Sequence, residues 1–234
     1  MSNDIQFETF LLVSYKRFSI LAIKKSNLQK IYQEEIWFPN DSNQINLDKL
    51  NFFLDNNIFK IEKALKNFVK NIYLIIDFNN FFPLRISLKK NNFGNQLSLN
   101  SLTNILNEAK DLCSKNLGEK KIVHFIIENY IIDEKHFSKL PKNINYKNFS
   151  LDLKFICLSN SLLKSFEQTL KRYQISIKRL VSFDYIKEFV DKDDTDIYNL
   201  SKTLVQGSFQ NEVLIVNKSI KKQGFFEKFF NFFS

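Results

Sequence analysis

Residues 7–38 read FETFLLVSYKRFSILAIKKSNLQKIYQEEIWF. This stretch holds three extended segments, 7–15, 18–23 and 30–38, and only two residues separate the first two. Short apolar runs rich in Phe, Ile and Val, joined by so tight a turn, are typical of antiparallel strands. The chain is therefore predicted to open with a hairpin followed by a third extended stretch.

A helix and a buried strand follow this opening. The helix is expected to begin near Leu47, and IYLIID at 72–77 is a β-branched apolar run typical of a buried strand. The predicted apolar face of the helix, at helical spacing, consists of Ile58, Ile61, Leu65, Phe68 and Val69.

A second, smaller block begins after Pro83. LRISL at 84–88 is strand-like, and Ser98 or Asn100 can cap a helix. KIVHFIIENYII at 121–132 and LDLKFICLS at 151–159 then read as two further strands. Residues 83–159 are therefore predicted to be a β-α-β-β unit inserted within the chain.

The alternation resumes after Ser159. A helix with Leu162, Leu163, Phe166, Leu170 and Tyr173 on one face precedes a strand at 175–183. A last helix is expected to run from the acidic cluster Asp191–Asp196 to about Gly207. Residues 210–223 are predicted to be a linker, although VLIV at 213–216 is more apolar than a free linker should be. The fold class expected from this order is α/β (α+β).

Composition gives the function only broad limits. Hydrophobic residues make up 44% of the chain, which predicts a globular protein, and no apolar run is long enough to span a bilayer. The first ten residues have no basic region followed by an apolar one, so we expect no secretory signal and a cytoplasmic location. Cys113, Cys157, His124 and His136 lack the paired spacing of zinc ligands, so we expect no metal site.

The net charge of +9 raises the possibility of a nucleic-acid partner. The chain, however, is crowded with Lys, Asn, Ile and Phe and has only four glycines and three prolines, a pattern typical of an AT-rich genome. Lys171, Arg172, Lys178 and Arg179 could face phosphates, but the solvated face of an amphipathic helix and strand explains them better. We expect no nucleic-acid binding.

No catalytic arrangement stands out either. Asp191, Asp193, Asp194 and Asp196 are the densest carboxylate cluster, and they lack the glycine and glutamate spacing of a calcium loop. An acidic start to the following helix accounts for them. We therefore expect that the protein is not an enzyme and has no catalytic residues.

The chain ends in GFFEKFFNFFS, residues 224–234. On a helical wheel the phenylalanines fall within an arc of roughly 160°. The predicted membrane-binding residues are Phe225, Phe226, Phe229, Phe230, Phe232 and Phe233, with Lys221, Lys222 and Lys228 beside them. Such a segment predicts a reversible anchor in the headgroup plane of anionic lipid. Two alternatives remain open: a final core helix, and a peptide that inserts into a partner's groove.

Three stretches resemble FtsA, the actin-like division protein that ties FtsZ filaments to the bacterial inner membrane. The first stretch is KKIVHFIIENYIIDE, residues 120–134, which is similar to a strand of the family. The second is residues 151–186, which are similar to the strand, helix and strand with which the family's chain leaves its inserted subdomain. The end of the chain is similar to the family's membrane-targeting helix, and TDIYNLSKTLVQGS at 195–208 resembles the helix before it.

The resemblance implies an actin-like, ribonuclease H-like subdomain 1A in two parts, 1–82 and 160–209. An SHS2-like subdomain 1C, 83–159, would be inserted between them, and the linker 210–223 and the helix 224–234 would follow. The second actin lobe of the family, subdomains 2A and 2B, has no counterpart in this sequence. The phosphate loop of the family would fall on Leu11-Leu12-Val13-Ser14, which lacks its aspartate and glycine. We therefore expect the ATP site of the family to be lost and no cofactor to bind.

The resemblance implies a non-catalytic cell-division adaptor on the cytoplasmic face of the inner membrane, at the division site. Its expected partners are anionic inner-membrane lipid, itself or a full-length FtsA through residues 83–159, and divisome proteins, with FtsZ bound directly or indirectly. The alternative is an actin-like inner-membrane scaffold of a pilus-assembly or secretion system. Those scaffolds typically lack the terminal amphipathic helix, so the end of this chain favours the division adaptor.

Overall fold

The computed structural model describes residues 7–38, 45–91, 99–141, 145–190, 195–207, 209 and 211–214. Five strands form the first sheet, in the order β3-β2-β1-β4-β9. They are β1 (Phe7–Ser14), β2 (Arg17–Lys24), β3 (Lys30–Trp37), β4 (Asn71–Asp77) and β9 (Ser176–Ser182). The first three pair antiparallel, whereas β4 pairs parallel with both β1 and β9. The opening hairpin and third strand are thus confirmed.

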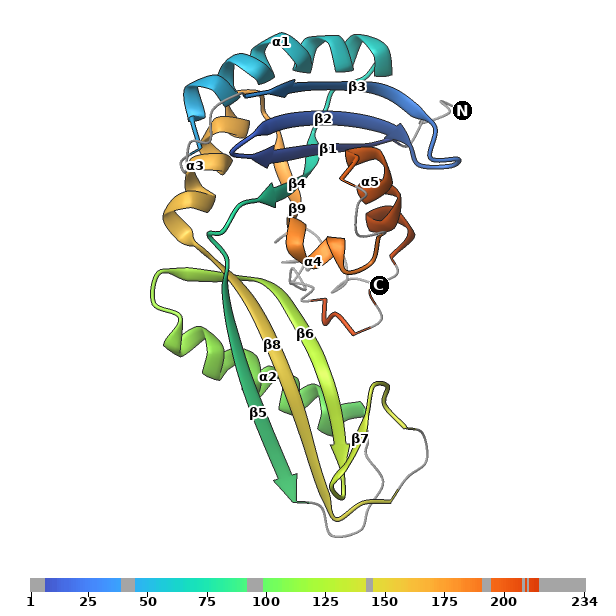
Figure 1. Ribbon diagram of the computed structural model, residues 1–234, viewed down its shortest axis with the longest axis vertical. Coiled ribbons are helices and arrows are strands. Elements are labelled where there is room, and N and C mark those ends of the chain that lie inside the picture. The colour runs from blue at the N-terminus through green and yellow to red at the C-terminus, as the bar shows by residue number, and fades with distance from the viewer. Residues whose placement is uncertain are drawn as a thin grey trace, which may run out of the picture.

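Helices cover both faces of this sheet (Figure 1). On one face α1 (Leu47–Leu65) and α3 (Asn160–Lys171) pack over Leu11, Val13 and Ile20. On the other face α4 (Phe183–Lys187) and α5 (Ile197–Gln206) pack over Phe10 and Leu12. The central strands are buried on both sides, which is why their sequences are continuously apolar and do not alternate.

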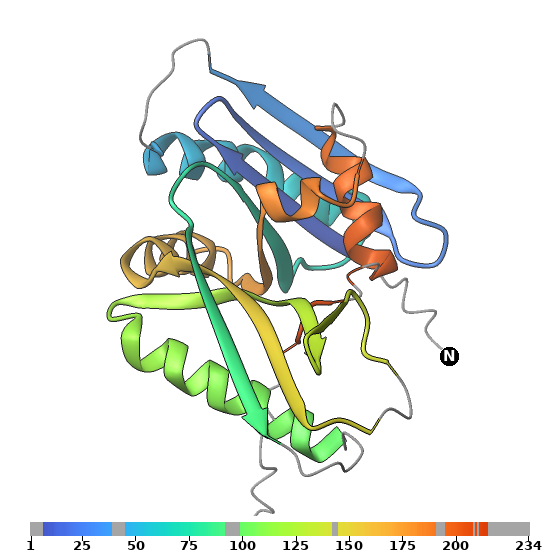
Figure 2. The same ribbon diagram turned by 60° about the horizontal axis from the view of Figure 1, so that its bottom comes forward.

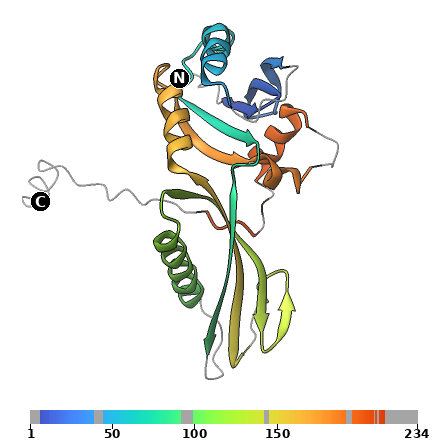
Figure 3. The same cartoon turned by 60° about the vertical axis from the view of Figure 1, so that its left-hand side comes forward.

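The second sheet has the order β5-β8-β6-β7 and is wholly antiparallel. Its elements are β5 (Phe82–Asn91), α2 (Leu99–Asn116), β6 (Lys120–Ile132), β7 (Lys135–Phe137) and β8 (Asn148–Ser159). Leu151, Leu153 and Phe155 alternate along β8 and face a core shared with α2. Figure 3 shows α2 on one side of this sheet, and no helix of the described residues lies on the opposite side.

The two sheets lie one beyond the other along the long axis of the molecule (Figures 1 and 2). β5 and β8 connect them, because β5 follows β4 and β8 leads into α3. Val123 and Leu158 pack with the core beneath α1, and Ile156 packs with the core beneath α5. The mixed α/β class expected from the sequence is confirmed.

Three sequence predictions need correction. The inserted unit is β-α-β-β-β, because the three-residue strand β7 pairs with the end of β6. Phe183 begins α4 and does not end β9. α1 ends at Leu65, because Lys66 takes a left-handed conformation (φ 52°) whose N–H bonds back to Glu62 and Lys63. Phe68 therefore lies outside the helix and is 72% exposed, although Val69 is buried as predicted.

Candidate functional site

The turn between β1 and β2 occupies the place of the phosphate loop expected from the resemblance. Ser14 closes it: its Oγ accepts hydrogen bonds from the backbone N–H of Lys16 (3.1 Å) and of Arg17 (2.8 Å). The same hydroxyl donates to the carbonyl oxygen of Arg17 at 3.1 Å. Because Ser14 already uses these two N–H groups, they are not available to cradle a phosphate.

The residues before this turn are core. Leu11, Leu12 and Val13 are fully buried in the centre of the first sheet, so they line no ligand-binding surface. The Arg17 side chain is also engaged, since it donates to the carbonyl oxygen of Thr195 and lies 4.0 Å from Glu35.

Asp77 is a carboxylate that the sequence analysis did not single out. It ends β4 and pairs in register with Ser14 on β1, so it lies where the carboxyl ends of parallel strands meet. Burial raises the pKa of Asp77, and the negative charge of Asp184 adds to this, whereas Arg17 and Lys187 oppose it. Among the described residues, no group of three or more His, Cys, Asp or Glu side chains could hold a metal ion.

A buried polar cluster joins the two sheets. His124 on β6 is fully buried, and its Nδ1 lies 2.8 Å from Oε1 of Glu212. Its Nε2 accepts a hydrogen bond from the N–H of Ser182, at the end of β9 (2.9 Å). Because Nε2 is the acceptor, the proton lies on Nδ1 and the neutral ring donates to Glu212. His124 is therefore a structural histidine.

Glu212 is the centre of this cluster. Its side chain is 4% exposed, and its second oxygen pairs with Nη2 of Arg179 and accepts from the Tyr185 hydroxyl at 3.3 Å. Burial lowers the pKa of His124, although Glu212 partly offsets the effect. Burial acts to raise the pKa of Glu212, but His124 and Arg179 outweigh it and hold that pKa below its usual value. The stable arrangement at neutral pH is a carboxylate beside a neutral imidazole.

Residues 211–213 dock on β6, so the linker predicted for 210–223 is wrong at this point. Ile127 donates its N–H to the carbonyl oxygen of Asn211 (2.9 Å), and Val213 donates to that of Phe125 (2.7 Å). Ile126 and Glu212 form an antiparallel bridge. We call residues 211–213 the latch. The apolar character of VLIV was the signal for it, since Val213 packs with the core of the second sheet.

The basic stretch near β9 is also tied into the fold. Lys178 pairs with both carboxylate oxygens of Glu8 (2.6 and 2.7 Å), and Arg179 pairs with Glu212. These two cations therefore compensate carboxylates and do not form a phosphate-binding surface. Asp196 caps α5 by accepting from the N–H of Tyr198 at 3.0 Å, as the acidic start predicted. Asp191, Asp193 and Asp194 lie outside the described residues.

The two cysteines lie in the core of the second sheet. Cys113 on α2 and Cys157 on β8 are free thiols, both fully buried. Burial raises the pKa of Cys113, and burial together with its neighbour raises the pKa of Cys157 to about 12. Thiols held in this protonated form are weak nucleophiles, so neither is suited to covalent catalysis.

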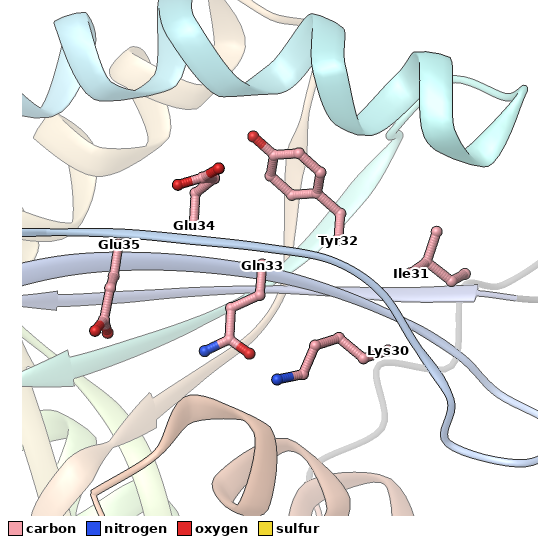
Figure 4. A pocket seen from close by; sticks show the side chains of 6 residues that line it. All are labelled: Lys30, Ile31, Tyr32, Gln33, Glu34 and Glu35. Atoms are coloured by element: carbon pink, nitrogen blue, oxygen red, sulfur yellow. The ribbon is translucent and has the colours of Figure 1, made fainter.

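A groove of about 490 Å³ follows the outer edge of β3. Figure 4 shows its six lining residues, Lys30, Ile31, Tyr32, Gln33, Glu34 and Glu35. Tyr32 and Glu34 point toward α1, whereas Lys30, Gln33 and Glu35 point toward α5. A single strand lines it, without polar groups converging from other elements. It therefore differs from the concave site that a small-molecule substrate requires.

The predicted membrane-binding residues, from Lys221 to Phe233, lie outside the described part of the chain. The last described residue is Leu214, 66% exposed, directly after the latch. No helix in the described ranges is long and apolar enough to cross a membrane.

Comparison with known proteins gives similarity only among solved structures. No protein-family profile matches the sequence. No curated protein matches it in sequence. The PilM–PilN type IV pilus biogenesis complex contains a chain that is similar over 78% of this protein, at 8% identity and a TM-score of 0.46.

Two further structures are similar. The cytoplasmic domain of EpsL, an inner membrane component of the type II secretion system of Vibrio cholerae, matches 76% of this chain at 12% identity (TM-score 0.36). A Bacteroides thetaiotaomicron protein with an actin-like ATPase fold matches 80% at 14% identity (TM-score 0.33). The matches cover 49%, 56% and 57% of those three chains, so this chain spans about half of their length. Each of the three structures is therefore similar to this chain in part of its fold only.

Proposed function

We propose that this protein is a non-catalytic, actin-like scaffold that attaches to the cytoplasmic face of the inner membrane through residues 224–234. The observation that carries the proposal is the latch. Residues 211–213 are hydrogen-bonded to β6, and the Glu212 side chain is buried between the sheets, so the chain is fixed to the folded body eleven residues before the terminal segment begins at residue 224. Attachment of the terminal segment to lipid then holds both sheets at the membrane, as an adaptor requires.

The absence of catalysis and of nucleotide binding is part of this proposal. Ser14 occupies the N–H groups of the turn, and Leu11, Leu12 and Val13 are core residues. We expect MgATP to leave the thermal unfolding midpoint unchanged, because a ligand stabilises only a state that it binds. A reproducible rise with MgATP that Ser14→Ala alters would contradict this part of the proposal.

The finer proposal is a role in cell division, as the similarity of residues 120–134 and 151–186 to FtsA implies. The adaptor would recruit divisome proteins through residues 83–159, bind itself or a full-length FtsA there, and meet the FtsZ ring directly or indirectly. The face of the second sheet opposite α2, over which no described helix lies, supplies a surface for such partners. It carries the ion pair Arg85–Glu128 (3.1 Å) and the hydrogen bond from Ser87 to Asp152 (2.7 Å).

Imaging tests both levels of the proposal. An N-terminal fluorescent fusion of the full chain is compared in dividing cells with one that lacks residues 224–234. We expect a midcell band that disperses into the cytoplasm when the segment is removed. The matched control replaces the polar side of the segment (Glu227→Ala, Asn231→Ala), which should leave the band in place.

The other outcomes separate the alternatives. Membrane labelling without a midcell band would retain the anchor, contradict the division role and favour a scaffold of a pilus-assembly or secretion system. A diffuse signal for the full chain would contradict the membrane attachment itself.

A further inference from the structure

β5 forms one outer edge of the second sheet over its whole length (Figure 1). It spans ten residues, Phe82–Asn91, and is the longest of the four strands that end a sheet in the described fold. No other described strand pairs with its outer side. An edge of this length presents a row of backbone donors and acceptors that fit an added strand.

The hydrogen bonds of β8 show which backbone groups of the sheet point toward this edge. Near one end of β8, the carbonyl oxygen of Asn148 accepts from the N–H of Asp133, beside β6 (3.0 Å). At the other end, the N–H of Asn160 donates to the carbonyl oxygen of Glu119, also beside β6 (2.9 Å). Backbone groups alternate in direction along a strand, so the even-numbered residues of β8 face β6 and the odd-numbered ones face β5.

The pairing of β8 with β5 carries this alternation to the edge. Odd-numbered residues of β8 lie opposite even-numbered residues of β5, as Leu153 lies opposite Ile86. The odd-numbered residues of β5 therefore direct their backbone groups outward. The outward groups include the carbonyl oxygen of Pro83, which has no N–H, and the N–H and carbonyl groups of Arg85, Ser87 and Lys89.

Apolar side chains accompany this open edge. Three residues of β5 pack with the core beneath α2 and yet are only half-buried, although the residues opposite them on β8 are fully buried: Leu84, Ile86 and Leu88. Glu108 of α2 pairs with Lys90 of β5 (2.6 Å), and Leu112, one turn further along the same side of α2, is 38% exposed. The core of the second sheet thus reaches this edge and remains partly open there.

We propose that β5 pairs antiparallel with β5 of a second copy of this chain, about a two-fold axis at Ile86, so that the two second sheets join into one. Ile86 then faces Ile86 of the second copy, and Leu84 faces Leu88, so the apolar row continues across the axis. The outward backbone groups of Arg85 bond with those of Ser87 of the second copy. The two-fold axis forms each of these contacts twice, as a self-complementary interface requires.

The charges of β5 favour this register over its neighbours. β5 has no acid, and its cations are Arg85, Lys89 and Lys90. In the proposed register these three lie opposite uncharged residues of the second copy, which are Ser87, Pro83 and Phe82 respectively. A shift of two residues sets Arg85 directly against Arg85 or against Lys89 of the second copy, which destabilises the pair. A shift of one residue places outward backbone groups against inward ones and turns the apolar row to the other face.

Two of the three cations are also compensated within one copy. Arg85 pairs with Glu128 (3.1 Å), and Lys90 pairs with Glu108 (2.6 Å). A second copy therefore meets an edge whose charge is largely balanced. Proline and lysine at an edge limit indiscriminate pairing, and here they leave the register centred on Ile86 as the most favourable one.

This inference deepens the proposed function and rests on it in one respect, the self-contact through residues 83–159. It assigns that contact to one strand, one register and one symmetry. Two copies joined in this way carry two terminal segments, and two weak membrane contacts on one body bind together far more tightly than either alone.

Cross-linking tests the register. Ile86→Cys places two thiols directly opposite each other across the axis, in a pair whose Cα atoms lie about 4.5 Å apart and which a disulfide can join. Leu84→Cys is the matched control, because its two copies lie about 14 Å apart along the strands in this register. The natural cysteines, Cys113 and Cys157, are fully buried and leave the background low. With oxidised glutathione as oxidant, we expect Ile86→Cys to form disulfide-linked dimers about tenfold faster than Leu84→Cys, or more.

Sedimentation equilibrium of the full chain, without lipid, tests the backbone and charge contacts. Ser87→Pro removes an outward N–H from each copy, and Ser87→Lys sets a cation against Arg85, so each should raise the dissociation constant of the dimer about tenfold or more. Ser87→Ala is the matched control, because it removes the hydroxyl that donates to Asp152 (2.7 Å) but keeps the N–H, and it should change the constant less than about twofold. Arg85→Glu combined with Ser87→Lys should restore association, because the two changes set opposite charges against each other.

Each protein is also made with the six terminal phenylalanines replaced by serine, so that association through residues 224–234 is excluded. Circular dichroism checks that each variant is folded. Should Ser87→Pro not fold, the charge variants and the cross-link decide.

Failures of the two proposals are distinguishable. A natural chain that stays monomeric would overturn the β5 pairing and leave the edge to a strand of another protein. A dimer that neither Ser87→Pro nor Ser87→Lys weakens, or cross-linking that is equal at the two positions, would overturn it as well and place self-association elsewhere. A fusion that is diffuse in cells, of a protein that dimerises through β5 in solution, would contradict the membrane attachment alone.

Discussion

His124 shows at the scale of one residue how the two sheets are joined. Its ring is fully buried on β6 and is bonded on one side to Glu212 and on the other to the end of β9. Only a neutral imidazole can donate from Nδ1 and accept at Nε2 at once. The joint therefore depends on the protonation state of a single ring.

This dependence predicts an acid-sensitive component of stability. Burial lowers the pKa of His124, so the unfolded chain binds the proton more readily than the folded one. The free energy of unfolding should fall as the pH drops below about 6.5, and this contribution should be complete above that value. His124→Phe should cost about 2–4 kcal/mol at pH 7.5, because Glu212 and the Ser182 N–H lose their partner.

Urea denaturation at pH 7.5 and 5.5 checks this prediction. His124→Phe should lose less stability between the two pH values than the natural chain does. His136, the other histidine, is exposed on β7, so His136→Gln serves as the control and should behave like the natural chain. An equal loss in all three proteins would contradict the assignment.

At the scale of elements, the sequence predicted what periodicity can reveal. β4, β6, β8 and α3 lie within a few residues of their predicted bounds, because long apolar runs and helical spacing determine them. β7 was missed because three residues carry no period. The end of α1 was missed because Lys66, not the usual glycine, takes the left-handed conformation.

The latch was missed for a different reason. Glu212 is a charged residue between Asn211 and Val213, and its burial depends on His124 and Arg179, which lie 88 and 33 residues away in the sequence. Such partners come together only in the folded chain. The terminal phenylalanines, in contrast, could be identified from the sequence, because their separation from the polar residues on a helical wheel involves only consecutive residues of the chain.

The latch has a measurable consequence of its own. Glu212→Ala removes one partner of a buried ion pair with Arg179, which should cost about 3 kcal/mol or more. Hydrogen exchange should then lose protection at the amides of Ile127 and Val213, which the latch bonds in the natural chain. The control is Glu128→Ala on β6, the strand that carries Ile127. Glu128 pairs with Arg85, whose side chain is 65% exposed, so its loss should lower the free energy of unfolding by less than about 1 kcal/mol. Retained protection at both amides in Glu212→Ala would show that the latch does not depend on its charge.

At the scale of the whole molecule, the question is whether two sheets with separate cores behave as one body. β6 and β8 contribute side chains to the cores of both sheets. Val123, Ile156 and Leu158 pack in the cores of the first sheet. Phe125 and Phe155 pack in the core of the second sheet. The latch adds hydrogen bonds and a buried charge to this junction. An adaptor that transmits the position of the membrane to its partners needs such coupling.

Cooperative unfolding tests this coupling, and the chain carries a natural probe for each sheet. Trp37, the single tryptophan, lies on β3, whereas Cys113 and Cys157 are buried in the core of the second sheet. In urea, tryptophan fluorescence and thiol reactivity should give the same midpoint, as expected when both sheets unfold in one transition. Glu212→Ala should separate the midpoints, with the thiols reacting first because the second sheet has lost its tie to β9. Separate midpoints already in the natural chain would mean that the two sheets are independent, and an adaptor role would then have to rest on one of them alone.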